Sequence, residues 1–198
     1  MNTDYWNKFY SDIANTNPST FAKMCLNYIS PNDTLLDVGC GDGRDSTFFA
    51  QRIKKVISID NSSKTIENLQ KNNELDNNEH HIVDINSLET TTISADVIDV
   101  VYCRFLLHAI TQDREDMLLN WSYNILPSGG RIMIETRTIE DKKLLKHYDN
   151  HLRRYISTDE LRIKLQSLGF TIIHEHQGTG LSPFKAEDPH LARFIAEK

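Results

Sequence analysis

The stretch from residue 34 to residue 53 constrains the fold of this chain more than any other. An apolar run over 34–38 ends at three glycines spaced two apart, Gly39, Gly41 and Gly43, and a helical pattern follows at once. Glycine has no Cβ and adopts backbone conformations that other residues avoid, so the pattern predicts a strand that turns sharply into a helix. Such a turn leaves backbone N–H groups uncovered at the helix start, where a polar or anionic group of a ligand can bind.

A second apolar run, over residues 56–59, ends at Asp60, 21 residues after Gly39. A carboxylate at the end of this strand can accept hydrogen bonds from both hydroxyls of a ribose. The sequence therefore predicts a ligand that contains a nucleoside. A dinucleotide fingerprint, G-x-G-x-x-G, requires its third glycine where this chain has Arg44, which disfavours an NAD-dependent oxidoreductase but leaves it as an alternative.

From residue 34 onward, strand and helix patterns alternate, which predicts a parallel sheet with right-handed crossovers. We expect strands over 34–39, 55–60, 81–84, 97–103 and 131–136, and helices over 44–53, from Ser62 or Ser63, and from Asp113 to Ile125. A helix over 158–168 ends at Gly169, a candidate left-handed cap. Two last strands, 170–176 and 191–197, have no helix between them, which predicts an antiparallel hairpin at the sheet edge.

Composition limits the class of protein. The 198 residues fit one domain, with a core large enough to need no disulfide or metal staples. A net charge of −6 disfavours nucleic acid as the main partner, since phosphate binding needs a basic surface. Cys25, Cys40 and Cys103 are odd in number and widely spaced, which predicts reduced thiols. No membrane span or signal peptide is visible. We expect a cytoplasmic monomer or homodimer with a small-molecule partner.

The pattern Asp-x-Gly-x-Gly-x-Gly, from Asp37 to Gly43, resembles motif I of the class I S-adenosylmethionine-dependent methyltransferases. The resemblance covers roughly residues 33–137, and the closing hairpin resembles the end of that family's sheet. It implies a Rossmann-like, doubly wound, seven-stranded, mostly parallel sheet, with S-adenosylmethionine as cofactor and S-adenosylhomocysteine as product. It also implies the cofactor-binding residues, which would be Trp6, Asp37, Gly39, Cys40, Gly41, Gly43, Asp60, Asn61, Asp84, Ile85 and Cys103.

Within that set the resemblance implies particular roles. Asp37 would lie near the methionyl ammonium, and Asp60 would hold the ribose. Asp84 would lie near the exocyclic amine of the adenine, with Ile85 against the ring. Related enzymes often close a lid formed by the segment before the first strand. Residues 1–32 carry two amphipathic helical stripes, with Asn17 or Ser19 as a candidate cap between them. They either pack on the sheet edge or form such a lid, with Trp6 and Tyr10 facing the ligands.

The acceptor side is predicted from basic residues. Arg104 follows the fourth strand, beside the expected methyl donor, and residues 138–156 form a basic stretch where related enzymes place acceptor-binding insertions. A charge run is usually a solvated helix face. Arginines can nevertheless bind a phosphate or carboxylate through paired hydrogen bonds. The predicted acceptor-binding residues are Tyr10, Arg104, Arg137, Arg153 and Arg154.

Methyl transfer from a sulfonium is an in-line displacement, so alignment is the main task of the protein. A general base is needed only for a weakly acidic hydroxyl or a protonated amine. Arg104, His108 and His147 are the candidate catalytic residues. His147 and His151 are four residues apart but lack the Glu of H-E-x-x-H and an obvious third ligand, so no metal is predicted.

The segment after the fourth strand, Cys103-Arg104-Phe105-Leu106, lacks the Pro-Pro-aromatic signature of enzymes that methylate nucleobase amines. The ending around residues 178–189 is similar to small bacterial methyltransferases of surface-glycan pathways. These features favour O-methylation of a small polar acceptor that is phosphorylated or sugar-linked, in polysaccharide biosynthesis. A protein that binds S-adenosylmethionine without turnover is the further alternative.

Overall fold

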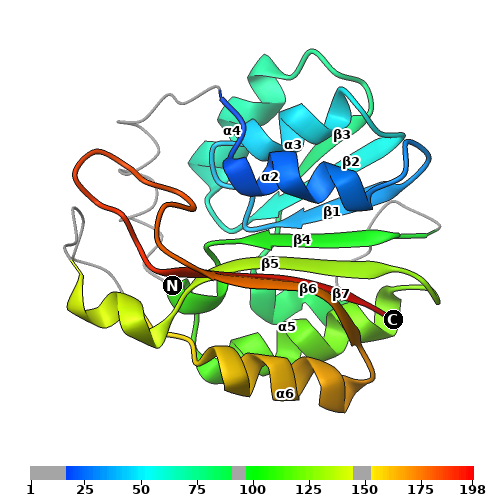
Figure 1. Cartoon of the computed structure of the whole chain (residues 1–198). Coiled ribbons are helices and arrows are strands. Elements are labelled where there is room, and N and C mark those ends of the chain that lie inside the picture. Colours follow the sequence, from blue (N-terminus) through cyan, green and yellow to red (C-terminus); the bar gives the residue numbers. More distant parts are fainter. Residues whose placement is uncertain (1–16, 91–96, 145–152) are drawn as a thin grey trace.

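A seven-stranded sheet forms the centre of the computed structural model, which describes residues 17–90, 97–144 and 153–198 (Figure 1). Its strands are β1 (Thr34–Val38), β2 (Lys55–Asp60), β3 (Asn78–Ile82), β4 (Val100–Arg104), β5 (Arg131–Arg137), β6 (Thr171–Gly178) and β7 (Leu191–Glu197). Their spatial order is β3-β2-β1-β4-β5-β7-β6. The first five strands are parallel, and β7 lies antiparallel between β5 and β6. This arrangement confirms the predicted mostly parallel sheet with an antiparallel closing hairpin.

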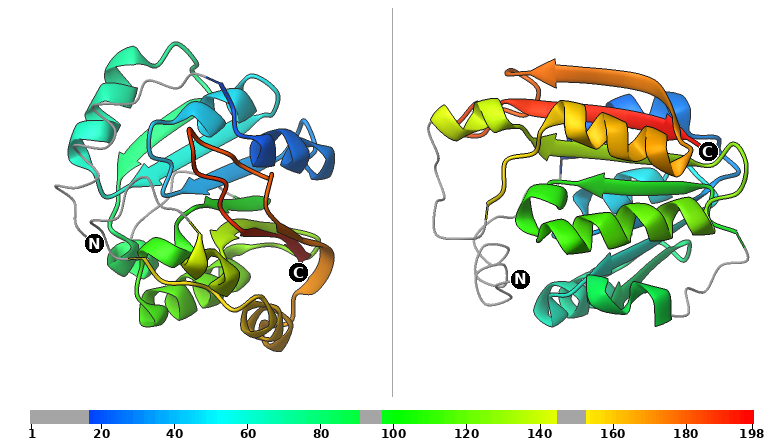
Figure 2. Two further views of the ribbon diagram at one scale, coloured as in Figure 1. Left: turned by 60° about the vertical axis from the view of Figure 1, so that its left-hand side comes forward. Right: turned by 90° about the horizontal axis from the view of Figure 1, so that it is seen from below.

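Helices cover both faces of the sheet (Figures 1 and 2). On one face lie α2 (Thr20–Cys25), α3 (Arg44–Ala50) and α4 (Ser63–Asn72), and on the other lie α5 (Gln112–Ile125) and α6 (Thr158–Leu168). Short 3-10 turns occupy Leu26–Tyr28, Ile85–Thr90, Leu107–Ala109 and Ile139–Lys143. Leu35 and Leu36 of β1 point to opposite faces and are both fully buried, one in each of two hydrophobic clusters. None of the helices in the described part of the chain is long and apolar enough to cross a membrane.

Three predicted helix boundaries are confirmed by their caps. Ser19 caps α2 by accepting a hydrogen bond from the N–H of Ala22 at 2.9 Å, and Ser62 caps α4 in the same way. Gly169 ends α6 in the left-handed conformation, with φ 105°. A short polar side chain at the start and a glycine at the end therefore fix these helices locally.

The third strand differs from the prediction over 81–84, because it occupies Asn78–Ile82. Its inward side chains at the start are Asn78 and His80, which are both buried. The hydroxyl of Ser58 donates to the side-chain oxygen of Asn78 at 3.3 Å. Because polar residues fill the inward positions, the strand lacks the apolar alternation that sequence analysis relies on.

A buried carboxylate joins α5 to α6. Glu115 is 2% exposed, and its two oxygens accept from Arg154 at 2.8 Å and from Lys164 at 2.7 Å. The same guanidinium nitrogen of Arg154 also lies 3.3 Å from the carbonyl of Ile110. The segment before α6 is therefore anchored to α5 by charge as well as by apolar packing.

We expect Glu115→Ala to lower the free energy of unfolding by about 3 kcal/mol, because it leaves two cations without their buried partner. Asp159→Ala is the matched control, since that carboxylate pairs with Arg162 while 80% exposed, and its loss should cost less than about 1 kcal/mol. Urea unfolding of both variants measures the difference, and equal losses would contradict the role of Glu115.

Candidate active site

The turn between β1 and α3 has the backbone that the glycine spacing predicts. Gly39, Gly41 and Gly43 have φ values of 76°, 52° and 72°, in the left-handed region that disfavours side chains. A Cβ at Gly39 would lie 3.2 Å from Leu106, and one at Gly43 would lie 2.6 Å from Leu69. The missing side chains therefore allow both the turn and the close approach of two neighbouring elements.

Asp60, at the end of β2, is held by the backbone. Its carboxylate accepts from the N–H of Ser62 at 2.9 Å and from the N–H of Gly41 at 3.1 Å. Burial raises the pKa of Asp60 above its ordinary value, although these N–H groups oppose the shift. The carboxylate thus ties the glycine turn to β2 and is fixed in direction.

A small, open hollow lies beside this carboxylate, at the carboxyl ends of the parallel strands, where ligands of open α/β sheets bind. Four predicted cofactor-binding residues line it, namely Gly39, Asp60, Asn61 and Ile85. The side-chain oxygen of Asn61 is buried and accepts no hydrogen bond from the described residues. A buried acceptor without a partner is uncommon, so it fits a donor from a ligand.

Sequence reasoning missed the other residues of the hollow, which are Val38, Ile59, Val83 and Leu106. Val38, Ile59 and Val83 each stand next to a predicted site residue at a strand end, so the strand ends gave a usable signal. Leu106 gave no signal, because it lies in the connection after β4 and approaches Gly39 only in the folded chain.

The remaining predicted cofactor residues lie elsewhere. Asp37 is buried and accepts from the hydroxyl of Ser46 at 2.6 Å, so it joins β1 to α3. Cys40 and Cys103 are buried, and burial raises the pKa of both thiols. Asp84 is exposed and accepts from the N–H of Asn86 at 2.8 Å. Trp6 lies outside the described residues. The cofactor contacts of these residues stay predictions.

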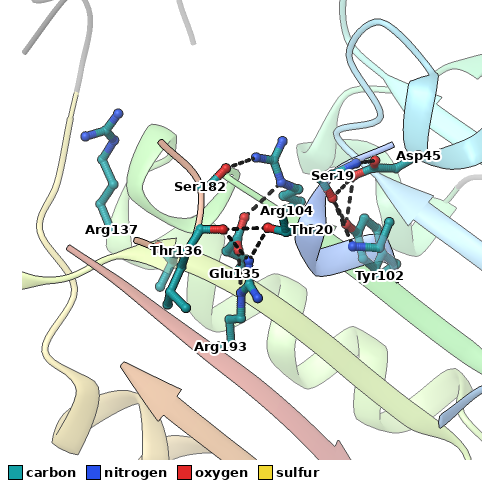
Figure 3. Close-up of polar contacts among 12 residues, drawn as sticks. Ser19, Thr20, Asp45, Tyr102, Arg104, Glu135, Thr136, Arg137, Ser182 and Arg193 are labelled. Atoms are coloured by element: carbon teal, nitrogen blue, oxygen red, sulfur yellow. Dashed lines mark hydrogen bonds and ion pairs between the residues drawn. The ribbon is translucent and has the colours of Figure 1, made fainter. Parts of the chain in front are cut away.

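A cluster of charged residues lies at the carboxyl ends of β4 and β5 and at the start of β7 (Figure 3). Glu135, at 0% exposure, accepts from Nε of Arg104 at 2.8 Å and from Nε of Arg193 at 2.7 Å. Arg104 also donates to the hydroxyl of Ser182 at 2.9 Å, and Arg193 donates to Thr20 at 2.7 Å. Burial lowers the pKa of Arg104, but the attraction of Glu135 outweighs it and keeps the guanidinium charged.

Arg193 and Ser182 were not predicted from the sequence. They come from β7 and from the loop between β6 and β7, and they meet Arg104 only because β7 pairs with β5. No local motif marks them. A second network in Figure 3 joins the start of α2 to α3 and β4, since Asp45 accepts from Ser19 and from the hydroxyl of Tyr102 at 2.8 Å.

The other predicted acceptor-side arginines are held by carboxylates. Arg137 is buried and pairs with Asp141 at 2.8 Å and with Glu187. Arg154 pairs with Glu115 of α5. Arg153, the residue before it, is half-buried. Tyr10 lies outside the described residues. Roles in acceptor binding stay predictions for these four residues.

Of the candidate bases, His108 is described and His147 is not. His108 is 3% exposed, and its Nδ1 accepts from the N–H of Arg137 at 3.3 Å. The neutral ring then carries its proton on Nε2, where it is a donor. His108 packs edge-on against Phe105 with ring centroids 5.5 Å apart, so it supports the turn after β4. Its role as a catalytic base stays a prediction.

The sheet order, the glycine turn and the fixed acid of β2 define an α/β protein with a site for a nucleoside-containing cofactor. A family model described as a methyltransferase domain matches residues 29–173, which is most of the chain. The chain belongs to the class I S-adenosylmethionine-dependent methyltransferase family. This membership confirms the predicted family and, with it, the predicted cofactor.

Individual relatives match shorter parts of the sequence. The chain is 51% identical over 53 residues, or 25% of its length, to a probable cobalt-precorrin-6B C(15)-methyltransferase (decarboxylating) from Methanobrevibacter smithii, covering 28% of that protein. It is 28% identical over 131 residues, or 63% of its length, to a carboxy-S-adenosyl-L-methionine synthase from Idiomarina loihiensis, covering 51% of it. The chain thus spans about half, or less, of these relatives.

A solved structure shows the same fold over more of the chain. The 1,6-didemethyltoxoflavin-N1-methyltransferase of Burkholderia thailandensis, crystallised with 1,6-didemethyltoxoflavin and S-adenosylhomocysteine, superposes with a TM-score of 0.67. The match covers 90% of this chain and 76% of the other, at 17% identity. At this identity the likeness supports the fold alone.

Asp37 gives the site a testable pH dependence. Burial, with smaller contributions from Asp45 and Asp60, raises its pKa from 3.8 to about 8. Between these values the folded state binds more protons than the unfolded state, so the free energy of unfolding falls as pH rises. Asp37→Asn keeps an acceptor for Ser46 but does not titrate. We expect a smaller decline in this variant, measured by urea unfolding at about pH 5 and about pH 8, and parallel declines would contradict the assignment.

Proposed function

We propose that this protein transfers the methyl group of S-adenosylmethionine to an oxygen of a small polar acceptor. The observation that carries the proposal is the hollow beside the fixed carboxylate of Asp60 and the glycine turn, next to a charged cluster at the same sheet edge. The proposed acceptor is phosphorylated or sugar-linked, and the bound small molecule of the Burkholderia relative supports an acceptor of low molecular weight.

The residues around the hollow fit this cofactor. Asp60 would accept from the ribose hydroxyls, and the unpartnered oxygen of Asn61 would accept a further hydrogen bond. Ile85 and Leu106 supply apolar surface for the adenine. When bound, S-adenosylmethionine supplies an electrophilic methyl group, and the residues of the chain hold the two reactants in line.

The rest of the proposal concerns setting and organisation. We infer a single domain over 1–198, with residues 1–32 as a lid and 138–156 as an acceptor-side insertion. Three buried cysteines without a disulfide suit the reducing cytoplasm, and we propose a monomer or homodimer there. A place in polysaccharide biosynthesis rests on the sequence of the ending around 178–189 alone.

Calorimetry tests the cofactor site directly. We expect S-adenosylmethionine and S-adenosylhomocysteine to bind and NADH not to bind. Asp60→Ala should weaken binding of S-adenosylhomocysteine by about 1–3 kcal/mol, through loss of hydrogen bonds to a charged group. Asp113→Ala, an exposed acid at the start of α5, is the control and should bind as the wild type does. Unchanged affinity of Asp60→Ala would refute the ribose assignment.

Turnover separates an enzyme from a binding protein. We expect formation of S-adenosylhomocysteine from S-adenosylmethionine when one member of a panel of sugar phosphates, nucleotide sugars and phenols is added. The acceptor-free reaction is the control. Binding of the cofactor without turnover across the panel would favour the alternative of a protein that binds S-adenosylmethionine without catalysis.

A further inference from the structure

The charged cluster at the ends of β4, β5 and β7 carries more than a structural role. We propose that it forms an oxyanion subsite, in which Arg104 binds a carboxylate or phosphate group of the acceptor. This inference rests on the proposed function, and it assigns the acceptor to the class of anionic small molecules. Three observations support it, namely the sharing of Glu135 by two arginines, the available donors and the backbone at Phe105.

Each arginine of the cluster has one carboxylate oxygen as its ion-pair partner. Two guanidinium groups, of Arg104 and Arg193, share the single carboxylate of Glu135, whose two oxygens are both used. Within the described part of the chain neither arginine forms an ion pair with another acid. Asp45 lies nearby and contributes a second negative charge, but its oxygens accept from Ser19 and Tyr102 and not from either guanidinium. The two arginines are therefore balanced in charge, but Glu135 alone holds them by hydrogen bonds, so an anion can still bind to donors that Glu135 does not use.

Arg104 has donors left for such an anion. Its Nε donates to Glu135 and its Nη2 to Ser182, whereas its Nη1 donates to no described residue. Ser182 accepts the hydrogen bond from Arg104, so its own hydroxyl proton can be donated to a ligand. The side chain of Arg104 is 13% exposed, and Figure 3 shows its guanidinium between Ser182 and Glu135. One edge of the guanidinium is thus fixed by the protein while the other can bind an oxyanion.

The backbone next to Arg104 is strained in a way that fixes this edge. Phe105 has φ 57°, in the region that residues other than glycine seldom adopt. Its N–H donates to the carbonyl of Glu135 at 2.8 Å. The conformation places its ring 4.1 Å from the guanidinium carbon of Arg104. Strain of this kind persists where the surrounding structure imposes it, commonly at functional sites.

The other arginines near this edge are held by other carboxylates. Arg137 pairs with two of them, Asp141 and Glu187. Arg154 shares Glu115 with Lys164 on the other side of the turn. The cofactor hollow is lined by the ends of β1 and β2, by Val83 and Ile85 after β3 and by Leu106, and Arg104 is not among its lining residues. Because Arg104 pairs with Glu135 of β5 outside that lining, we assign an anion at Arg104 to the acceptor.

Inorganic phosphate and acetate are the probes for this subsite, titrated by calorimetry into the protein saturated with S-adenosylhomocysteine. We expect saturable binding of at least one of them, and an affinity lower by about tenfold or more in Arg104→Gln, which cannot form charged hydrogen bonds. Arg131→Gln is the matched control, because Arg131 pairs with Glu197 at the opposite end of β5. Its anion affinity should equal that of the wild type.

The outcomes separate the two proposals. Failure of the wild type to bind S-adenosylhomocysteine would overturn the proposed function itself. Binding of S-adenosylhomocysteine without saturable anion binding, or equal anion affinity in Arg104→Gln, would overturn only the subsite. Weaker binding of S-adenosylhomocysteine by Arg104→Gln would show that the arginine holds the methionyl carboxylate instead, and would also overturn it.

A measurement on the wild type removes any dependence on the folding of the variant. Phenylglyoxal modifies accessible arginines, and mass spectrometry of peptides reports each site separately. We expect phosphate to slow modification of Arg104 and to leave Arg131 unchanged. Equal protection of both arginines, or of neither, would contradict an oxyanion subsite at Arg104.

Discussion

The left-handed turn after β1 is the constraint on which the rest of the site depends. Because Gly39 and Gly43 carry no side chains, β1 passes directly into α3, and Leu106 and Leu69 come close to the turn. The N–H of Gly41 then reaches the carboxylate of Asp60 at 3.1 Å. One backbone conformation therefore brings the ends of β1, β2 and β4 around the same hollow, and the direction of Asp60 follows from it.

Buried carboxylates organise the remainder of the sheet edge. Asp37 links β1 to α3, Asp45 links α3 to α2 and β4, and Glu135 links β5 to β4 and β7. Each accepts hydrogen bonds from side chains of other elements, which offsets the cost of burying it. Glu135 differs from the first two because its partners are both arginines, and Arg104 keeps a donor beyond this ion pair that a ligand can use.

Local patterns predicted the elements whose signals lie in neighbouring residues. The strand–glycine–helix unit, the caps at Ser19, Ser62 and Gly169, and the closing hairpin were all predicted and are confirmed. The predicted bounds of the third strand were wrong because its buried positions carry the polar residues Asn78 and His80. Arg193 and Ser182 were missed because their contact with Arg104 needs the pairing of β5 with β7.

By itself, the sequence determined the fold and the cofactor class, since the glycine spacing, Asp60 and the alternation of strands and helices are local features. Only the tertiary structure decided how charge is shared among the arginines. Arg104, Arg137 and Arg154 look equivalent in the sequence, yet the acids that face them come from β5, from the loop between β6 and β7, and from α5. Because ion pairs form across packed elements rather than along the chain, the sharing of Glu135 by Arg104 and Arg193 becomes visible only in the folded protein.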